Sequence, residues 1–374
     1  MKRILVAFFL FSVADKVVAQ KSIVIKNTLP VSRIEEVVEV PWAEVVKAYP
    51  SIDTSNFKVI NKNTKLELAY QLEYKGQAEI QNLLVQTTIP ANGKVVLQIV
   101  KGKHKTFVAK TYCRFVPERK DDFAWENDRI AFRTYGKALE KFPNEMAYGI
   151  DVWVKRTNEL VIDKRYKAGT YHVDNGDGLD YYHVGRTLGA GGIAPYLKDT
   201  IWYPANFREW KILDNGPLRS TFQLLYDEWT VAGKKMRVRK TISLNAGSQM
   251  NKNEVLYEWD GEETLTVAVG IIKRNEPGEL LLNEQKGVLS YWEPLHGKDG
   301  ITGVGCVFTS GVSRMLVDKE QLLALSKGSK NKAFVYYNGA AWNKAGKLTD
   351  ALQWAAYLYH FQATVLNPLL ISVQ

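Results

Sequence analysis

The sequence predicts an all-β protein, in which a small N-terminal β-sandwich is followed by a larger β-sandwich with few helices. Short segments rich in β-branched and aromatic residues recur along the chain, and turns such as the Pro-Ala-Asn-Gly run at 90–93 separate them. After Pro117 the predicted strands lengthen, and several alternate apolar with polar residues. Helical patterns are scarce. The one persuasive helix is 351–361, with Thr349 or Asp350 as its N-cap.

The predicted strands fall into two groups, which define two domains at residues 20–116 and 117–374. Many long antiparallel strands after Pro117 favour a single large sandwich there rather than two further domains. The strands expected in the first domain are 57–60, 66–72, 83–89, 95–100 and 106–112, and those in the second are 130–135, 220–231, 235–244, 254–259, 265–272, 288–292, 303–308, 314–317 and 332–337.

The first nineteen residues are typical of a cleavable signal peptide. Lys2 and Arg3 precede the apolar run 4–14, which is shorter than the roughly 20 residues that a membrane-spanning helix needs. We expect cleavage between Ala19 and Gln20, and no cysteine follows that bond to carry a lipid anchor. The sequence therefore predicts a periplasmic or secreted protein without a membrane anchor.

Composition narrows the partners that the chain is expected to bind. The formal net charge is +10 and the cationic residues are spread rather than blocked, which is compatible with an ordinary solvated surface. For an exported protein, such a charge favours anionic glycans over nucleic acid. The two cysteines, Cys113 and Cys306, are too few for a disulfide scaffold, and their spacing leaves open whether they pair.

Four stretches combine charged, aromatic and glycine residues, and the richest of them is 171–192. Two of the five histidines lie in it, beside tyrosines and an arginine, and these residue types transfer protons and hold carboxylates. The alternative interpretation is a surface loop whose tyrosines merely pack. The other stretches are 117–129, 151–156 and 336–342. From 171–192 we take His183, Tyr182, Arg186 and Tyr181 as candidate catalytic residues, and Tyr171 and His172 as candidate substrate-binding residues.

The first two stretches add further candidates for substrate binding. Trp125 could stack on a sugar ring while Glu126 and Asp128 accept hydrogen bonds from its hydroxyls. Lys155 and Arg156 could hold a carboxylate. A salt-bridged domain junction is the alternative interpretation of the first stretch.

Known cofactor and nucleophile motifs are missing from the sequence. There is no Gly-x-Ser-x-Gly elbow, HExxH or phosphate loop, and no GxGxxG in 171–192. The Asp/Asn/Gly run at 174–180 resembles a calcium loop, but Gly185 stands where an EF-hand needs glutamate. We interpret this run as a turn without metal and expect no cofactor, although a divalent cation such as calcium stays open.

Together the motifs resemble a family of secreted proteins from polysaccharide-degrading bacteria, catalogued as a domain of unknown function. The resemblance covers nearly the whole mature chain. It implies a fold similar to the galactose-mutarotase-like β-supersandwich and, by a looser association, a relation to oligosaccharide dehydratases. It supplies no catalytic residues. The motifs that carry it are PERKDDFAWENDRIAFRTYG at 117–136, DVWVKR at 151–156, YHVDNGDGLDYYHVGRTLGAGG at 171–192 and YYNGAAW at 336–342.

The function expected from this resemblance is elimination of water from a terminal uronic acid of an oligosaccharide. A cation must neutralise the carboxylate, a base must remove the C5 proton, and an acid must protonate the leaving hydroxyl. Arg186, or Arg156 or Lys155, suits the first role, and His183 suits proton transfer. A tyrosine among 171, 181 and 182 could take the other proton role. A mutarotase or epimerase, and a non-catalytic glycan-binding protein, are the alternatives.

His183 and Arg186 are expected to face one pocket and act on one anionic sugar. Residues three apart on a strand would point to opposite faces of the sheet. The prediction therefore requires this segment to be a loop or turn, which Gly185 and Gly189 permit.

Overall fold

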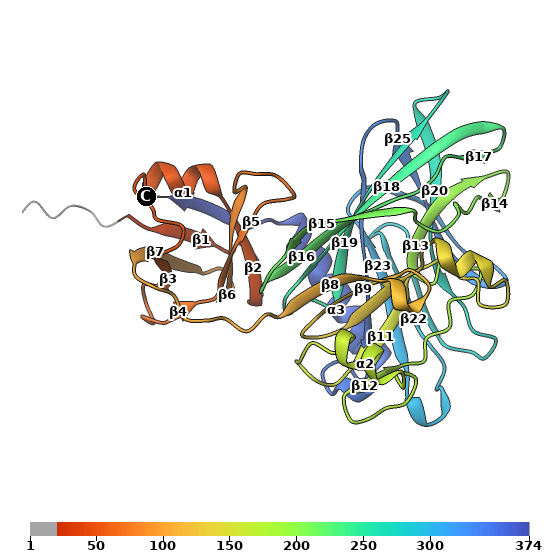
Figure 1. Ribbon diagram of the computed structural model, residues 1–374, viewed down its shortest axis with the longest axis horizontal. Helices are drawn as coiled ribbons and strands as arrows, with labels where there is room; N and C mark the ends of the chain where they lie inside the picture. The colour runs from red at the N-terminus through yellow and green to blue at the C-terminus, as the bar shows by residue number, and fades with distance from the viewer. Residues whose placement is uncertain (1–20, 374) are drawn as a thin grey trace, which may run out of the picture.

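A computed structural model describes residues 21–373, and the expected signal peptide at 1–19 lies outside the described residues. The all-β prediction is confirmed: antiparallel sheets dominate and three α-helices accompany them in the described part of the chain. Figure 1 shows the small N-terminal sandwich lying beside the much larger β-rich body. In the larger body, two five-stranded sheets and the nine-stranded sheet contribute side chains to one extended apolar core.

The small sandwich is built from both ends of the chain. Its five-stranded sheet has the order β27-β1-β7-β3-β4, so a C-terminal strand completes a sheet made of N-terminal strands. Its three-stranded sheet has the order β2-β6-β5, and α1 packs on the same core. The bounds are β1 Ile23–Lys26, β2 Arg33–Pro41, α1 Trp42–Ala48, β3 Phe57–Asn61, β4 Glu67–Leu68, β5 Tyr70–Glu73, β6 Asn82–Ile89, β7 Lys94–Lys101 and β27 Leu370–Val373.

The prediction that a strand at 106–112 belongs to the small sandwich is wrong. Strand β8 (Thr111–Val116) pairs with β9 (Asp122–Asn127) in a second sheet, not with the small sandwich. That sheet has the order β12-β11-β10-β9-β8, and helix α2 lies next to it. The remaining bounds are β10 Ala131–Thr134, β11 Asp151–Lys155, α2 Ile162–Ala168 and β12 Gly178–Asp180.

The nine-stranded sheet and a further five-stranded sheet complete the larger body. The long strand expected at 220–231 is interrupted and forms β16 and β17. In the nine-stranded sheet lie β15 Glu209–Asn215, β16 Arg219–Leu225, β17 Trp229–Val231, β18 Lys234–Asn245, β19 Met250–Trp259, β21 Glu279–Asn283, β22 Val288–Trp292, β23 Thr302–Phe308 and β26 Phe334–Trp342; in the other lie β13 Ala190–Leu197, β14 Thr200–Ile201, β20 Thr264–Ile272, β24 Val312–Val317 and β25 Gln321–Ser329.

Helix α3 (Ala351–Leu366) packs against the outer face of the nine-stranded sheet. Two glycines of β23 make this close approach feasible. A Cβ atom on Gly305 would lie 2.6 Å from Leu358 Cδ1, and one on Gly303 would lie 3.0 Å from Trp354 Cδ1. The strand therefore presents a flat, side-chain-free surface on which the two large apolar residues of the helix rest.

The predicted helix start is confirmed. The Asp350 side chain accepts a hydrogen bond from the Gln353 backbone N–H, 2.8 Å away, and so acts as the N-cap. We expect Asp350→Ala to lower the free energy of unfolding by about 1 kcal/mol because that N–H loses its partner. Urea denaturation measures this, and Asp350→Ser should restore most of the loss. Equal stability of all three proteins would contradict the capping role.

Candidate functional site

The sheet formed by β8 to β12 has one apolar and one charged face. Along β9, Phe123 and Trp125 belong to the core shared with the nine-stranded sheet, whereas Asp122 and Glu126 point the other way. The charged side chains are nevertheless buried, since α2 and the following segment cover that face. The sequence motifs at 117–136, 151–156 and 171–192 therefore meet in a buried layer of charged side chains.

Arg133 is the centre of this layer and is surrounded by three carboxylates. Its Nε atom donates to Asp151 at 2.9 Å, Nη2 donates to Asp180 at 2.9 Å, and Nη1 lies 3.6 Å from Asp122. Burial, reinforced by neighbouring Asp151, raises the pKa of Asp180 to about 8. Burial likewise raises the pKa of Asp122 to about 6. We call Asp122, Arg133, Asp151 and Asp180 the Arg133 cluster.

These raised pKa values predict how stability depends on pH. Between about pH 4, the ordinary carboxyl range, and pH 8 the folded protein holds a proton on Asp180 that the unfolded chain has released. The free energy of unfolding therefore falls as pH rises through this window. Asp180→Asn cannot ionise, so its unfolding free energy should depend less on pH. Urea denaturation from pH 4 to 8 (about the window above) measures this; identical slopes would contradict it.

Several residues expected to bind sugar are structural instead. Trp125 is fully buried and its Nε1 donates to Asn251 at 2.8 Å, so its ring is not available for stacking. Glu126 and Lys155 form a fully buried ion pair of 2.7 Å. Asp128, also buried, accepts from the Gly247 N–H at 2.7 Å. All four side chains are buried, so the expected sugar contact is wrong at these positions.

Tyr171 and His172 lie at the edge of the Arg133 cluster. Tyr171 stacks on Trp153, with ring centroids 4.9 Å apart, and accepts from Arg119 at 3.2 Å. His172 is exposed, and its Nδ1 lies 2.9 Å from the main-chain oxygen of Asp180. Tyr171 thus has a packing role, whereas His172 is an exposed imidazole whose Nδ1 lies next to the backbone of Asp180.

Segment 181–189 has no regular secondary structure, as the expected His183–Arg186 arrangement requires. Gly185 and Gly189 adopt φ values of 56° and 63°. Both His183 and Arg186 are exposed, and Arg186 donates to the Pro143 carbonyl at 3.3 Å. Neither residue lines either of two cavities, of about 760 and 630 Å³, in the described chain. Their joint action on one sugar therefore stays an expectation from the sequence alone.

Tyr181 meets groups that the sequence did not single out. It accepts a hydrogen bond of 2.6 Å from Thr302, and its ring stacks on that of His296, with centroids 5.1 Å apart. Burial raises the pKa of Tyr181, so the phenol stays protonated. The His296 side chain is 63% exposed, and its Nδ1 lies 3.4 Å from Asp299. A phenol that can donate a proton therefore lies beside an accessible imidazole.

A buried ion pair completes this arrangement. Arg274 Nε donates to Glu293 at 2.7 Å and its Nη1 donates to the His183 carbonyl at 2.7 Å. The guanidinium also lies over the Tyr182 ring, which is buried, so Tyr182 supports Arg274 and cannot itself reach a substrate. Burial raises the pKa of Glu293 to about 7, close to neutral. We call Tyr181, Arg274, Glu293 and His296 the Tyr181 cluster.

The sequence motifs at 151–156 and 336–342 meet next to the Tyr181 cluster. Arg156 lies over the Trp342 ring, 5.0 Å from its centroid, and pairs with Asp174. Trp342 in turn donates to the main-chain oxygen of Asp299, whose carboxylate lies 3.4 Å from His296 Nδ1. Asp174 also accepts from the backbone of the Asp/Asn/Gly run, at Gly176 and Gly178. The run therefore folds as an Asx-type turn tied to Arg156.

Three further features of residues 21–373 concern metal ligands, thiols and membrane-spanning helices. No group of three His, Cys, Asp or Glu side chains there is placed to hold a metal ion. The thiols of Cys113 and Cys306 are both buried and free. Among the helices of this part of the chain, none has the length and apolar character to cross a membrane.

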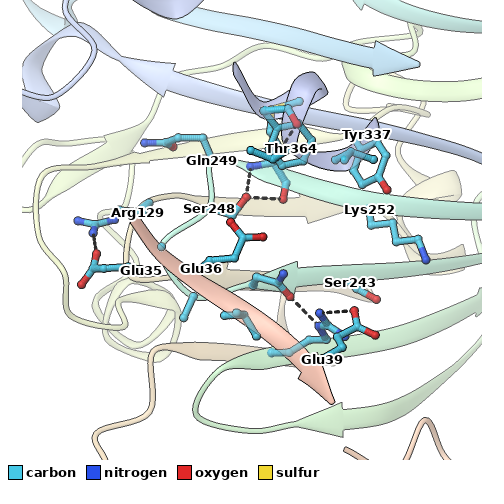
Figure 2. A pocket seen from close by; sticks show the side chains of 18 of the residues that line it. Glu35, Glu36, Glu39, Arg129, Ser243, Ser248, Gln249, Lys252, Tyr337 and Thr364 are labelled. Carbon is cyan, nitrogen blue, oxygen red and sulfur yellow. Dashed lines mark hydrogen bonds and ion pairs between the residues drawn. The ribbon is translucent and has the colours of Figure 1, made fainter. Parts of the chain in front are cut away.

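The larger cavity lies elsewhere, between β2 of the small sandwich and the outer face of the nine-stranded sheet. Its volume is about 760 Å³. Figure 2 shows β2 crossing the view, with Glu36 and Glu39 close to this strand and Lys252 and Tyr337 farther from it. No residue of the predicted site lines the cavity. We call it the interdomain cavity.

Comparisons with known proteins identify the family of the chain. The chain is 30% identical to "Uncharacterized protein P7" of Formosa agariphila over 404 residues, covering all of both chains. It also aligns with an α-mannosidase from Enterococcus faecalis V583 (TM-score 0.49) and with a glycosyl hydrolase family 38 protein from Enterococcus faecalis (TM-score 0.48). Each is 9% identical and covers 95% of this chain. The chain spans about half the length of these solved chains, 46% and 47%. Residues 25–371 match the family described as "Domain of unknown function (DUF4861)", and the chain therefore belongs to that family.

Proposed function

We propose that this protein is an exported carbohydrate-active enzyme, a carbon–oxygen lyase that eliminates water from the terminal uronic acid of an oligosaccharide. The observation that carries the proposal is the Tyr181 cluster. In it a protonated phenol stacks on an exposed imidazole, and Arg274 contacts the next residues of the same segment, Tyr182 and His183. These are the acid, the base and the cation that the elimination needs.

Each group takes one role in the reaction. His296 removes the C5 proton, the C4–O bond breaks as the C4=C5 bond forms, and Tyr181 protonates the departing hydroxyl to give water. Arg274 neutralises the substrate carboxylate, which makes the C5 proton more acidic. Arg156, anchored on Trp342, is the second candidate for that role. His296 then loses its proton to solvent, and Tyr181 regains one.

The ion pair with Glu293 explains how the charge of Arg274 is stabilised in a partly buried site when no substrate is bound. Arg274 is only 19% exposed, and Glu293 balances its charge before substrate arrives. Because the pKa of Glu293 is raised to about 7, this carboxyl can take up a proton when a substrate carboxylate comes to Arg274. The site would then bind an anionic sugar without assembling two uncompensated negative charges.

The direct experiment is to mix the protein with uronic-acid oligosaccharides and follow ultraviolet absorbance for a new C=C bond conjugated to the carboxylate. We expect absorbance to rise with the wild-type protein. Faster anomer or epimer exchange without absorbance would instead support a mutarotase or epimerase, and binding without either change would support a glycan-binding protein.

Two histidine variants then identify the base. His296→Ala should abolish turnover while changing affinity little, since a proton-transfer group acts mainly in the transition state. His183→Ala, at the position favoured by the sequence, should retain turnover because its carbonyl, not its ring, contacts Arg274. The reverse result would return the base role to His183.

A further inference from the structure

We propose that the interdomain cavity is a second carbohydrate site, which binds a neutral oligosaccharide and performs no chemistry on it. Its volume of about 760 Å³ lies within the range of about 300–1,000 Å³ that small-molecule sites occupy. It also lies between two structural units, where such sites are frequent. Nothing in the proposed elimination uses it.

One wall of the cavity is a row of uncharged polar side chains. They project from the outer face of β16 and β18, at alternate positions of each strand. Thr221 donates to Ser243 at 3.1 Å, and Gln223 donates to Thr241 at 3.2 Å. Hydroxyl and amide groups both donate and accept hydrogen bonds, so this wall matches a ligand that carries many hydroxyls.

The charges of the lining favour a neutral ligand over an anionic one. Six Lys or Arg and five Glu side chains line the cavity. Arg219 pairs with Glu39 and Glu73, each at 2.8 Å, and Lys252 lies 3.1 Å from Glu254. At Arg219 and Lys252 an anionic sugar would have to displace a glutamate from its cation, whereas a neutral sugar can hydrogen-bond to these pairs as they stand.

Gln249 offers a hydrogen bond that the protein itself leaves unused, and Tyr337 adds an aromatic ring to the lining. The Gln249 side chain, 8% exposed, lines the cavity, and its Oε1 atom is buried without a partner. A buried acceptor of this kind costs free energy unless a ligand or water satisfies it. Tyr337 lines the cavity with a half-buried ring, which meets Phe361 edge to face, 5.2 Å between centroids. The strand registers place it in one row with Lys252 and Ser243, all three labelled in Figure 2. Aromatic rings of this kind stack on the apolar face of a sugar.

The test is calorimetric titration of the whole protein with neutral tri- and tetrasaccharides of glucose, xylose, mannose, galactose and rhamnose. We expect at least one to bind. Lys252→Met should then raise its Kd about tenfold, the scale of a lost charged hydrogen bond. Tyr337→Ala should raise it as much or more. The matched control Lys47→Met removes an exposed cation from α1, away from the cavity, and should leave the Kd unchanged.

A further control separates this proposal from the proposed elimination. His296→Ala should bind the neutral sugar as the wild type does, whether or not the protein proves to be a lyase. Binding of none of the panel at millimolar concentration would overturn the proposal. So would binding that Lys252→Met and Tyr337→Ala both leave unchanged, or a cavity that binds uronic-acid oligosaccharides or peptides in preference to neutral sugars.

Discussion

Replacing Arg133 with methionine should lower the free energy of unfolding by about 3–5 kcal/mol, the cost of leaving buried charges without their partner. Arg133 is 4% exposed and contacts Asp151 and Asp180 directly. Methionine fills similar space but cannot hydrogen-bond, so the carboxyls would have to bind protons or admit water. Urea denaturation at neutral pH measures the change.

Replacing an exposed arginine by methionine is the control for Arg133→Met. Arg237 is 65% exposed on β18 and pairs with Glu228, so Arg237→Met should change stability by less than about 0.5 kcal/mol. If the loss in Arg133→Met comes from uncompensated carboxylates, adding Asp151→Asn should recover part of it. Equal, small losses for Arg133→Met and Arg237→Met would show that the buried layer of charged side chains does not hold the sheet together.

Tyr181→Phe should lower kcat by about 10²- to 10⁴-fold, the range expected for loss of a general acid. The phenylalanine ring preserves stacking on His296, so affinity should change little. Steady-state kinetics on a uronic-acid oligosaccharide measures the effect.

The neighbouring tyrosine is the natural control. Tyr182 is 4% exposed and its hydroxyl has no hydrogen-bond partner, so Tyr182→Phe should leave kcat nearly unchanged. A large loss in both variants, or in Tyr182→Phe alone, would contradict the assignment of the acid to Tyr181.

Much of the strand content was predictable from local pattern. Segment 83–89 is rich in β-branched residues and ends at a turn, and it forms β6. The prediction failed at 106–112 because the pairing partner decides to which sheet a strand belongs, and β9 could not be identified as that partner from propensity. The return of β27 to the small sandwich depends on the same long-range pairing.

The candidate site was only partly predictable for a related reason. The sequence at 122–126 alternates charged or small residues with Phe123 and Trp125, and this period of two already indicated that Trp125 faces a core. Clustering of aromatic and acidic residues suggested sugar binding instead. Tyr181 was identified, but Arg274, Glu293 and His296 lie about a hundred residues away in unremarkable loops, and only the fold brings them to it.

The proposed elimination removes one water from an intact oligosaccharide. Mass spectrometry of a uronic-acid oligosaccharide before and after incubation with the protein measures this change. We expect a product of unchanged chain length that is lighter by one water and appears together with the new ultraviolet absorbance. Shorter saccharides, or a product of unchanged mass, would contradict it.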